Sequence, residues 1–403
     1  MKKVQTPKTI VLAYSGGLDT SFCIPYLRER HGARIVTVTV DTGGFTKPQL
    51  KTLAGRAKKL GAVRHYAIDA KKEVWDEYLT TIIQGHCLRG GVYPLCVSAE
   101  RTTQAEVAVR IARREKADAI AHGSTGAGND QVRFDAAFAA LAPDLEVLAP
   151  IRDLGISREE ERRRLAELGV VLPPKVSRYS INAGLCGVTI GGGETHDSWA
   201  YPPEEAWTST ADPASAPRKG ELLTLSFVKG IPVALNGRRM DGVRLITALA
   251  VTGGRHGVGR GIHLGDTILG IKGRIAFEAP ATLIAIAAHR ELEKLVLTAL
   301  QQNWKNQAGE AYGQLLHGGL AFDPVVRDLK ALIRSSQEAV TGDVRVRLRQ
   351  GRIEVEGVRS RRSLLAPKAA RYGESNSLWT GRDAAGFCRI YGVQARLSRL
   401  ARA

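Results

Sequence analysis

The chain of 403 residues is poor in cysteine and has no long hydrophobic run. Its cysteines are odd in number and form no C-x-x-C pair; they are Cys23, Cys87, Cys96, Cys186 and Cys388. Their scatter argues against a disulfide framework or a zinc knuckle and predicts reduced thiols in the cytoplasm. No apolar run approaches the roughly 20 residues of a membrane-spanning helix, so we expect no membrane partner. The apolar run at residues 10–13 is too short for a secretory signal and predicts a buried strand.

Aromatic residues make up only 6% of the chain, whereas the formal net charge is +18. A positive charge of this size permits nucleic acid, a membrane surface or polyanionic small molecules as partners. No series of aromatic residues accompanies the basic ones, as binding of a single-stranded nucleic acid would need. We therefore interpret most of the charge as solvated surface and expect no nucleic-acid partner.

Much of the basic excess lies in the segment VRVRLRQGRIEVEGVRSRR, close to the C-terminus. A hairpin that turns at residues 350–351 places Arg347 opposite Glu354. The same register places Arg345 opposite Glu356. Cross-strand ion pairs of this kind contribute only about 0.2–1 kcal/mol each, but they give several arginines a structural role.

Short apolar runs alternate with amphipathic stretches over the first part of the chain. We predict strands at residues 8–14, 33–41, 64–70 and 118–124, and helices at residues 19–32, 47–62 and 99–117. This alternation predicts an α/β fold with a doubly wound parallel sheet, which binds ligands at the carboxyl ends of its strands.

Residues 157–169 predict a further helix. Ser157 is its expected N-cap, Glu160 is expected to complete a capping box, and Gly169 ends the helix. The segment VVLPPK, residues 170–175, then has the composition of a linker.

Glycine, proline and tryptophan become frequent beyond this linker. We predict strands at residues 221–230 and 231–237, and helices at residues 290–305 and 325–340. We therefore expect three parts: a nucleotide-binding domain at residues 1–172, a second α+β domain at residues 173–365, and a C-terminal tail at residues 366–403.

The string IVLAYSGGLDTS, residues 10–21, passes from an apolar strand through Ser15, Gly16 and Gly17 into a helix. Glycine lets backbone N–H groups approach an anion without a Cβ in the way. The helix N-terminus adds about half a positive charge at the same place. A phosphate is the natural occupant, although the string matches neither a Walker A loop nor a G-x-G-x-x-G turn.

The complete string resembles the PP-loop of ATP pyrophosphatases, which cleave ATP between its α and β phosphates. The resemblance implies that this loop surrounds pyrophosphate and its Mg²⁺. These enzymes share a reaction rather than a substrate, so the substrate has to be inferred from other residues.

A second string, AHGSTGAGNDQVRF at residues 121–134, also passes from a strand through glycines into a helix. Asn129 and Arg133 share a helix face, and Asp130 lies three residues before Arg133. Arg133 suits a carboxylate, Asp130 an ammonium and Asn129 either, so the group could bind a zwitterion. The alternative is a capped helix with an internal Asp130–Arg133 ion pair, and the residues alone leave both open.

Together the two strings resemble the argininosuccinate synthase family, and the similarity continues in LAPDLEVLAPIRD, GIPVALNG, RHGVGR, SSQEAVTGDV and DAAGFCRIYGV. The resemblance implies an ATP-dependent carbon–nitrogen ligase of arginine biosynthesis with Mg²⁺ as a cofactor. Citrulline and aspartate are the implied substrates, and a cytoplasmic homotetramer is the implied assembly. The family adenylates the ureido oxygen of citrulline, and the amino group of aspartate then displaces AMP. Positioning and charge stabilisation would be the protein's contribution.

The resemblance also implies which residues bind each substrate. ATP is expected at Ala13, Tyr14, Ser15, Gly16, Gly17, Leu18, Asp19, Thr20, Ser21, Val40 and Gly123, with Ser15 and Asp19 in catalytic roles. Aspartate is expected at Thr125, Asn129 and Asp130. Citrulline is expected at Tyr93, Ser98, Asn129, Arg133, Ser180 and Thr189.

The chain departs from the family pattern at two further citrulline positions. A glutamate is expected at Gly265 and a tyrosine at Phe277, and Asp266 is a candidate replacement for the missing carboxylate. Loss of a charged hydrogen-bond partner costs about 1.5–3 kcal/mol. Either the amino-acid pocket is rearranged, which we favour, or the ureido substrate is altered.

Two other functions compete with this interpretation. A PP-loop enzyme that modifies tRNA would suit the positive charge, but sulfur transfer needs a catalytic cysteine pair or an iron–sulfur site. Cys87 and Cys96 are the only close pair, and they are nine residues apart without further ligands. A nucleotide-binding module without catalytic activity would not need the group at residues 129–133, which could bind a zwitterion.

Overall fold

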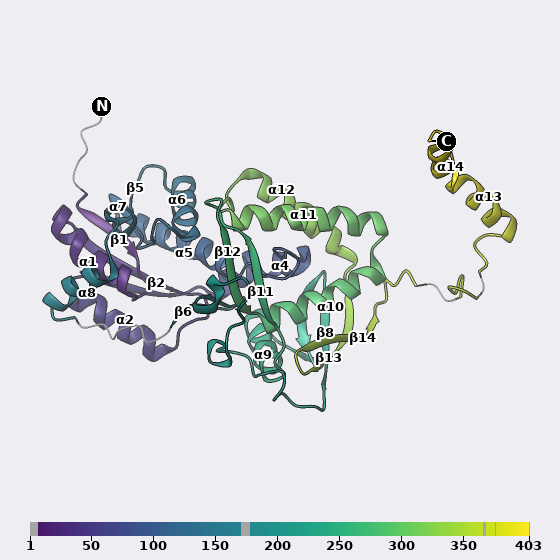
Figure 1. Cartoon of the computed structure of the whole chain (residues 1–403), viewed down its shortest axis with the longest axis horizontal. Coiled ribbons are helices and arrows are strands. Elements are labelled where there is room, and N and C mark those ends of the chain that lie inside the picture. Colours follow the sequence, from purple (N-terminus) through teal and green to yellow (C-terminus); the bar gives the residue numbers. More distant parts are fainter. Residues whose placement is uncertain (1–6, 171–177, 366–367, 375, 403) are drawn as a thin grey trace. The chain divides into compact units, whose positions relative to one another are not determined.

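The computed structural model describes residues 7–170, 178–365, 368–374 and 376–402. The chain divides after Ser360 into two compact units. The first holds the sheets and most helices, and the second holds the two C-terminal helices (Figure 1). No helix within the described ranges is long and apolar enough to cross a membrane.

A five-stranded parallel sheet of order β3-β2-β1-β4-β5 forms the N-terminal part of the first unit. Its strands are β1 (Thr9–Ala13), β2 (Arg34–Asp41), β3 (Arg64–Asp69), β4 (Ala119–Ala121) and β5 (Glu146–Leu148). The predicted doubly wound sheet is thereby confirmed. Because β1 lies between β2 and β4, the strand order reverses there, and such a switch point opens a crevice at the carboxyl ends of the strands.

Helices cover both faces of this sheet. They are α1 (Leu18–His31), α2 (Lys47–Lys59), α5 (Cys96–Glu115), α6 (Asn129–Leu141), α7 (Pro150–Leu154) and α8 (Arg158–Glu167). Ile10 and Leu12 pack with α1, α2 and α8 on one face, whereas Val11 packs with α5 and α6 on the other. In Figure 1, α1 and α8 lie to the left of this sheet, and α5 and α6 lie to its right. The sequences of the central strands are continuous apolar runs because both faces of the sheet are buried.

Helix α8 begins at its predicted N-cap. The Ser157 side chain accepts a hydrogen bond from the Glu160 N–H at 3.2 Å. The other half of the predicted capping box is wrong, because the Glu160 carboxylate pairs with Arg163 and Arg164. Hydrogen bonds between two charged groups are stronger than a bond to a neutral backbone N–H, so the Glu160 carboxylate binds the arginines and not the N-cap N–H. Of the predicted linker, all but Val170 lies outside the described residues.

The second part of the first unit contains two antiparallel sheets, of order β10-β9-β8-β13-β14 and β11-β12-β7-β6. The strands are β6 (Tyr179–Gly184), β7 (Gly187–Gly192), β8 (Glu221–Val228), β9 (Ile231–Leu235), β10 (Arg238–Arg239), β11 (Arg260–Asp266), β12 (Lys272–Glu278), β13 (Gly342–Arg349) and β14 (Arg352–Arg359). The helices are α9 (Gly242–Arg255), α10 (Pro280–Val296), α11 (Ala299–His317) and α12 (Pro324–Ser336).

Short helical segments connect the two parts. They are α3 (Lys71–Glu73), a π-helical turn (Val74–Leu79) and α4 (Thr80–Gly85). Apolar side chains of this connection share one core with α9, α10, α11 and α12. This common core explains why the sequence-predicted nucleotide-binding and α+β parts form a single compact unit.

The helix predicted at residues 290–305 is two helices. The Thr298 side chain accepts the Gln301 N–H at 3.2 Å and starts α11, two residues after α10 ends at Val296. A side-chain cap of this kind satisfies a backbone donor that the first turn leaves free, so it stabilises a new helix start.

The C-terminal hairpin forms with the predicted turn but not with all the predicted pairs. Arg347 does lie opposite Glu354, whereas an irregularity after Arg345 places that residue opposite Gly357. The expected Arg345–Glu356 pair is therefore wrong, and Glu356 pairs with Arg347 instead. An extra residue in one strand shifts every later cross-strand neighbour, which a simple count from the turn cannot anticipate.

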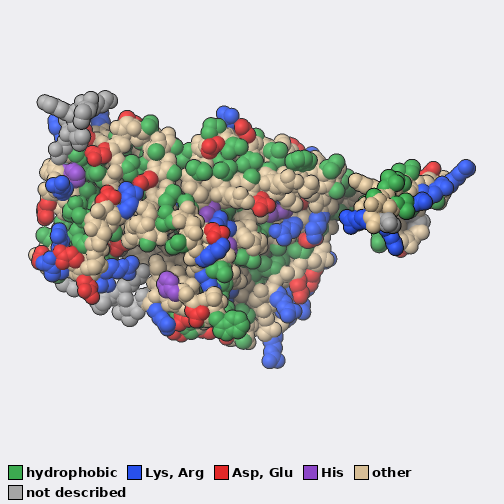
Figure 2. Space-filling model, turned by 45° about the horizontal axis from the view of Figure 1, so that its top comes forward, with side chains coloured by type: hydrophobic (Ala, Val, Ile, Leu, Met, Phe, Trp, Pro, Cys, Tyr) green, Lys and Arg blue, Asp and Glu red, His purple; other side chains and the backbone are tan. Residues whose placement is uncertain are grey.

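The second unit consists of α13 (Gly381–Tyr391) and α14 (Val393–Leu400), and neither helix has a buried residue. Figure 2 shows hydrophobic side chains exposed on this unit. They are Phe387, Ile390, Tyr391, Val393, Leu397 and Leu400. Clustered exposed apolar side chains are typical of an interaction surface.

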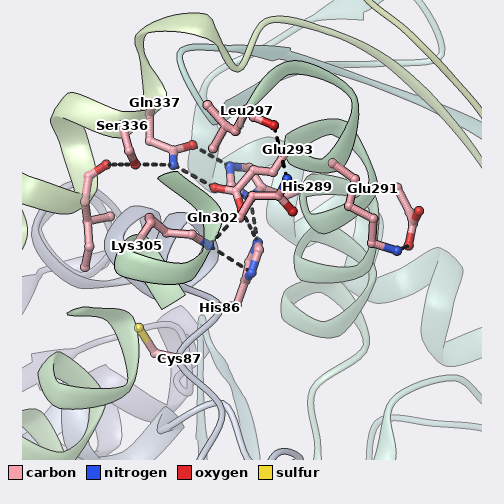
Figure 3. Close-up of polar contacts among 12 residues, drawn as sticks. His86, Cys87, His289, Glu291, Glu293, Leu297, Gln302, Lys305, Ser336 and Gln337 are labelled. Atoms are coloured by element: carbon pink, nitrogen blue, oxygen red, sulfur yellow. Dashed lines mark hydrogen bonds and ion pairs between the residues drawn. The ribbon is translucent and has the colours of Figure 1, made fainter. Parts of the chain in front are cut away.

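Five polar side chains form a closed ring in the shared core (Figure 3). The Lys305 ammonium donates to His86 Nδ1 at 2.9 Å, and His86 Nε2 contacts His289 Nδ1 at 2.8 Å. His289 Nε2 then meets Gln337 Oε1 at 2.8 Å, and Gln337 Nε2 donates to Glu293 at 2.7 Å. Lys305 closes the ring with a 2.7 Å ion pair to Glu293. Since an ammonium only donates, each imidazole must accept at Nδ1 and donate from Nε2.

The ring includes His86, His289 and Glu293, which could together offer three ligand atoms to a metal ion. Their lone pairs are already used within the ring, and the Lys305 ammonium lies among them. A further cation would have to displace a buried ammonium, so the ring is better explained as a structural network.

We expect the free energy of unfolding to fall as the pH is lowered from about 6.5 towards 4. Burial lowers the pKa of His86 well below 6.5 and that of His289 to about 4. Between these pH values the two imidazoles are protonated in the unfolded chain but neutral in the folded chain. The contribution of the neutral imidazoles to stability is complete above their pKa in the unfolded chain. It is lost as the pH falls through their pKa in the folded protein. Urea unfolding at a series of pH values measures it. A His289→Gln variant should show a shallower slope, and an unchanged slope would contradict the assignment.

Candidate active site

A cavity of about 1080 Å³ opens where the two glycine-containing strings meet. The strings follow β1 and β4, which are neighbouring strands of the parallel sheet. From there the cavity continues to the hairpin of β11 and β12 in the second part of the unit. The switch point of the sheet thus forms one end of the cavity, and an antiparallel hairpin forms the other.

The PP-loop presents free backbone donors to the cavity. Gly16 has a φ of +74°, and a Cβ there would lie 2.0 Å from a methyl group of Leu53. Ser15 Oγ accepts the Gly17 N–H at 3.3 Å and contacts Thr20 Oγ1 at 3.1 Å. Gly17 caps α1 without a side-chain hydrogen bond, so no side chain competes for the first N–H groups of the helix. Such an end of a helix favours an anion.

Three arginines surround this end of the cavity. Arg56 Nη1 donates to the Gly16 carbonyl at 2.7 Å. Arg158 and Arg162 project from α8 into the cavity wall, and neither has an ion pair in the described part of the chain. Our sequence analysis missed all three. The i, i+4 spacing of the α8 pair was visible, but only the tertiary fold brings that helix to the PP-loop.

Two carboxyl groups also meet beside the PP-loop. Asp19 lines the cavity, and Glu161 of α8 is buried with its Oε2 atom lacking a hydrogen-bond partner. Burial and the adjacent Asp19 carboxylate raise the pKa of Glu161 to about 7. The Glu161 carboxyl group therefore holds its proton more tightly than an exposed glutamate does.

The start of α6 places an ion-pair network in the cavity wall. Asp130 accepts from Arg133 Nη1 and from Arg101 Nε, each at 2.8 Å. Burial alone would raise the pKa of Asp130, but the two guanidinium charges hold it below its ordinary value. Asn129 Oδ1 accepts the Ile268 N–H at 2.8 Å and so connects α6 to the β11–β12 hairpin. The internal Asp130–Arg133 pair is present, yet it faces the cavity.

Tyr93 and Thr189 lie together in the cavity wall. Their hydroxyl oxygens are 2.9 Å apart, and the Val97 N–H donates to Tyr93 Oη at 3.2 Å. Either hydroxyl can donate in the contact between Tyr93 and Thr189. Burial raises the pKa of Tyr93 beyond the physiological range, so the phenol stays neutral.

Most residues that the sequence analysis singled out line this one cavity. The lining includes Ala13, Tyr14, Ser15, Gly16, Gly17, Leu18, Asp19, Thr20, Val40, Tyr93, Gly123, Thr125, Asn129, Asp130, Arg133, Ser180, Thr189, Gly265 and Asp266. Ser21, Ser98 and Phe277 are buried behind the wall. Phe277 packs against Tyr93 with ring centres 5.4 Å apart, and Ser98 Oγ has no hydrogen-bond partner.

The candidate replacement carboxylate at Asp266 is already engaged. It forms a 2.5 Å ion pair with Lys272 on the opposite strand. Gly265 faces Gly273 across the same hairpin, so neither strand offers a side chain at that level of the cavity.

A parallel sheet whose switch point opens into a cavity, a glycine-containing loop with helix N–H groups at one end of it and paired charged groups at the other are arranged as in an ATP-dependent ligase. Residues 9–170 match the family model described as arginosuccinate synthase N-terminal HUP domain, and residues 179–398 match the arginosuccinate synthase C-terminal domain. The chain therefore belongs to the argininosuccinate synthase family, whose members are ATP-dependent ligases of arginine biosynthesis.

Individual relatives agree with this assignment. The chain is 42% identical over 390 residues to the argininosuccinate synthase of Trichodesmium erythraeum, covering 96% of this chain and 97% of the relative. It is 39% identical over 387 residues to that of Methanocaldococcus jannaschii, with coverages of 96% and 97%. It is 40% identical over 394 residues to that of Xanthomonas campestris, with coverages of 97% and 98%.

Proposed function

We propose that this chain condenses citrulline with aspartate in the cavity described above. The ureido oxygen of citrulline attacks the α-phosphorus of ATP, and pyrophosphate leaves. The amino nitrogen of aspartate then attacks the ureido carbon, loses a proton, and AMP departs with the ureido oxygen. The observation that carries the proposal is that a PP-loop and a zwitterion group, more than 100 residues apart in the chain, share one cavity.

The phosphates of ATP would occupy the end of the cavity at β1. The N–H groups at the start of α1 and the guanidinium groups of Arg56, Arg158 and Arg162 would surround the departing pyrophosphate. Oriented donors of this kind stabilise charge that develops on the leaving group. Val40 and Gly123, at the ends of β2 and β4, would hold the nucleoside.

The same end fits a magnesium ion. Mg²⁺ takes hard oxygen ligands, and Asp19 with Glu161 offers two carboxyl groups, one of which has a buried oxygen without a partner. The ion would supply positive charge against the phosphates, and Asp19, which lines this end of the cavity, would hold it.

The two amino acids would bind towards α6 and the hairpin. Thr125, Asn129 and Asp130 would bind aspartate, with Asp130 accepting from its ammonium. Asn129, Arg133, Tyr93, Ser180 and Thr189 would contact citrulline. Ser21, Ser98 and Phe277 lie behind the wall and would support it rather than touch a substrate.

No nucleophilic side chain is needed for this reaction. No cysteine is among the described residues that line the cavity. Burial raises the pKa of Cys87 to about 12 and that of Cys96 well above its ordinary value, so both stay protonated. These thiols do not favour the sulfur-transfer alternative.

We also propose a cytoplasmic homotetramer in which the second unit contacts other copies. The exposed apolar side chains of α13 and α14 support the assembly. The free cysteines support a reducing compartment.

AMP and pyrophosphate are expected only when ATP, aspartate and a citrulline are all present. Because the ureido oxygen leaves with AMP, citrulline labelled with ¹⁸O at that position should transfer the label to AMP. Mass spectrometry of the nucleotide measures this. Formation of ADP and orthophosphate, or pyrophosphate release that ignores citrulline, would refute the proposed function.

A further inference from the structure

One histidine of the cavity wall has no part in the reaction as described above. His122 follows β4, is 1% exposed and lines the cavity. Its ring stacks on that of Phe134 from α6, with ring centres 5.5 Å apart and 17° between the planes. A buried imidazole beside a reaction centre could transfer a proton or hold other groups in place, and its hydrogen bonds decide between the two roles.

Both ring nitrogens of His122 are engaged by protein groups. The Ser124 N–H donates to His122 Nδ1 at 3.2 Å, so this nitrogen carries no hydrogen. The hydrogen of the neutral ring is therefore on Nε2, which donates to Asp135 Oδ1 at 2.8 Å. Asp135 Oδ2 in turn accepts from Arg152 Nη1 at 2.6 Å. These bonds fix the tautomer of the imidazole and leave it no lone pair for a proton of the substrate.

The N–H group that His122 binds belongs to a segment with two proposed substrate contacts. Ser124 stands between Gly123, the proposed contact of the nucleotide, and Thr125, the proposed contact of aspartate. A Cβ at Gly123 would lie 2.8 Å from Thr20 Cγ2 and 3.1 Å from Thr20 N, so this backbone packs directly against the start of α1. A displacement of the segment would therefore change its distance from the PP-loop as well as the place of Thr125.

Further contacts hold the same segment at its other end. Gln131 Nε2 from α6 donates to the Gly126 carbonyl at 2.5 Å. A Cβ at Gly126 would lie 3.5 Å from Cγ of Arg152, so the arginine that binds Asp135 also packs beside this glycine. Side chains from outside the segment thus fix it at the Ser124 N–H and at the Gly126 carbonyl.

We propose that His122 is a positioning residue that holds residues 123–125 in place for ATP and aspartate and transfers no proton. The inference rests on the proposed function and concerns only how that site is held. The atom that acts is Nδ1, which binds the Ser124 N–H. Asp135, itself bound by Arg152, keeps the ring hydrogen on Nε2. The proposed contacts of citrulline lie on other segments, so its binding does not depend on His122.

Three substitutions in the full chain test the proposal, with pyrophosphate release as the assay and each substrate varied in turn. His122→Ala removes both hydrogen bonds and should raise KM for ATP and for aspartate about ten- to a hundredfold. His122→Asn keeps an acceptor at the position of Nδ1 and should recover most of this loss. His122→Gln keeps only a donor near the position of Nε2 and should recover little. KM for citrulline should change less than about twofold in all three variants.

Other outcomes would overturn the inference. Equal losses of kcat in His122→Asn and His122→Gln, with unchanged KM values, would indicate proton transfer. A similar rise of all three KM values would indicate a general loss of structure, and unchanged KM values in His122→Ala would leave the imidazole without a role. His196→Ala is the control, because His196 is exposed and does not line the cavity, and it should keep wild-type kinetics. Absence of pyrophosphate release by the unaltered protein would instead refute the proposed function.

Discussion

Replacement of Asp130 by asparagine is expected to lower kcat/KM for aspartate by on the order of a hundredfold or more. Asp130 is the one anion between Arg101 and Arg133, each 2.8 Å away. Asparagine keeps the size but leaves two buried guanidinium groups facing each other. Truncating one partner of a buried charge pair costs about 2–5 kcal/mol. The proposed acceptor for the ammonium of aspartate is lost at the same time.

Steady-state kinetics with aspartate as the varied substrate measures this effect. Asp144→Asn is a matched control, because Asp144 pairs with Arg113 on the surface, and its side chain is 59% exposed. That variant should keep wild-type kinetics. If Asp130→Asn raised KM for aspartate less than severalfold and left kcat intact, the role assigned to Asp130 would be wrong.

Replacement of Lys305 by methionine is expected to lower the free energy of unfolding by about 3–5 kcal/mol. Lys305 is fully buried and forms a 2.7 Å ion pair with Glu293, which is 2% exposed. Methionine fills a similar volume but leaves the Glu293 carboxylate without a cation. It also removes the donor that orients His86 and so opens the hydrogen-bonded ring (Figure 3). Such rings are stable only when every member is satisfied.

Urea unfolding at pH 7 measures this loss. The control is Lys294→Met, because Lys294 pairs with Glu291 at the surface and its side chain is 53% exposed. Surface pairs contribute about 0–1 kcal/mol, so the control should change little. A loss below about 1 kcal/mol for Lys305→Met would show that the ring does not stabilise the fold. None of its members lines the cavity, so the folded variant should retain its kcat.

The sequence analysis identified the parts of the site that are encoded in short segments. The PP-loop and the start of α6 were recognised because each combines an apolar strand, glycines and polar residues within about a dozen positions. Their meeting could also be anticipated, since parallel strands end at the same edge of a sheet. The strands themselves were found because β-strands buried on both faces read as apolar runs.

Contacts between segments far apart in the chain were not anticipated. Arg101 and Asp130 lie on different helices, and the approach of Glu161 to Asp19 depends on how α8 packs on α1. The ring around Lys305 joins residues from α10, α11 and the end of α4. No local sequence pattern indicates that a lysine will be fully buried. The desolvation cost of burying its charge is offset by a partner that only the folded structure brings close.

Predictions from local sequence also failed where one residue changed the register of a hairpin or started a new helix. The irregularity after Arg345 shifted the hairpin pairs, and Thr298 divided one expected helix into two. Strand periodicity, glycine turns and apolar runs are properties of neighbouring residues, so the amino-acid order was enough to establish the parallel sheet and its phosphate loop. The charge balance of the cavity depends on which distant side chains come within a few ångströms, so only the packed fold could reveal that Arg101 and Arg133 share the Asp130 carboxylate.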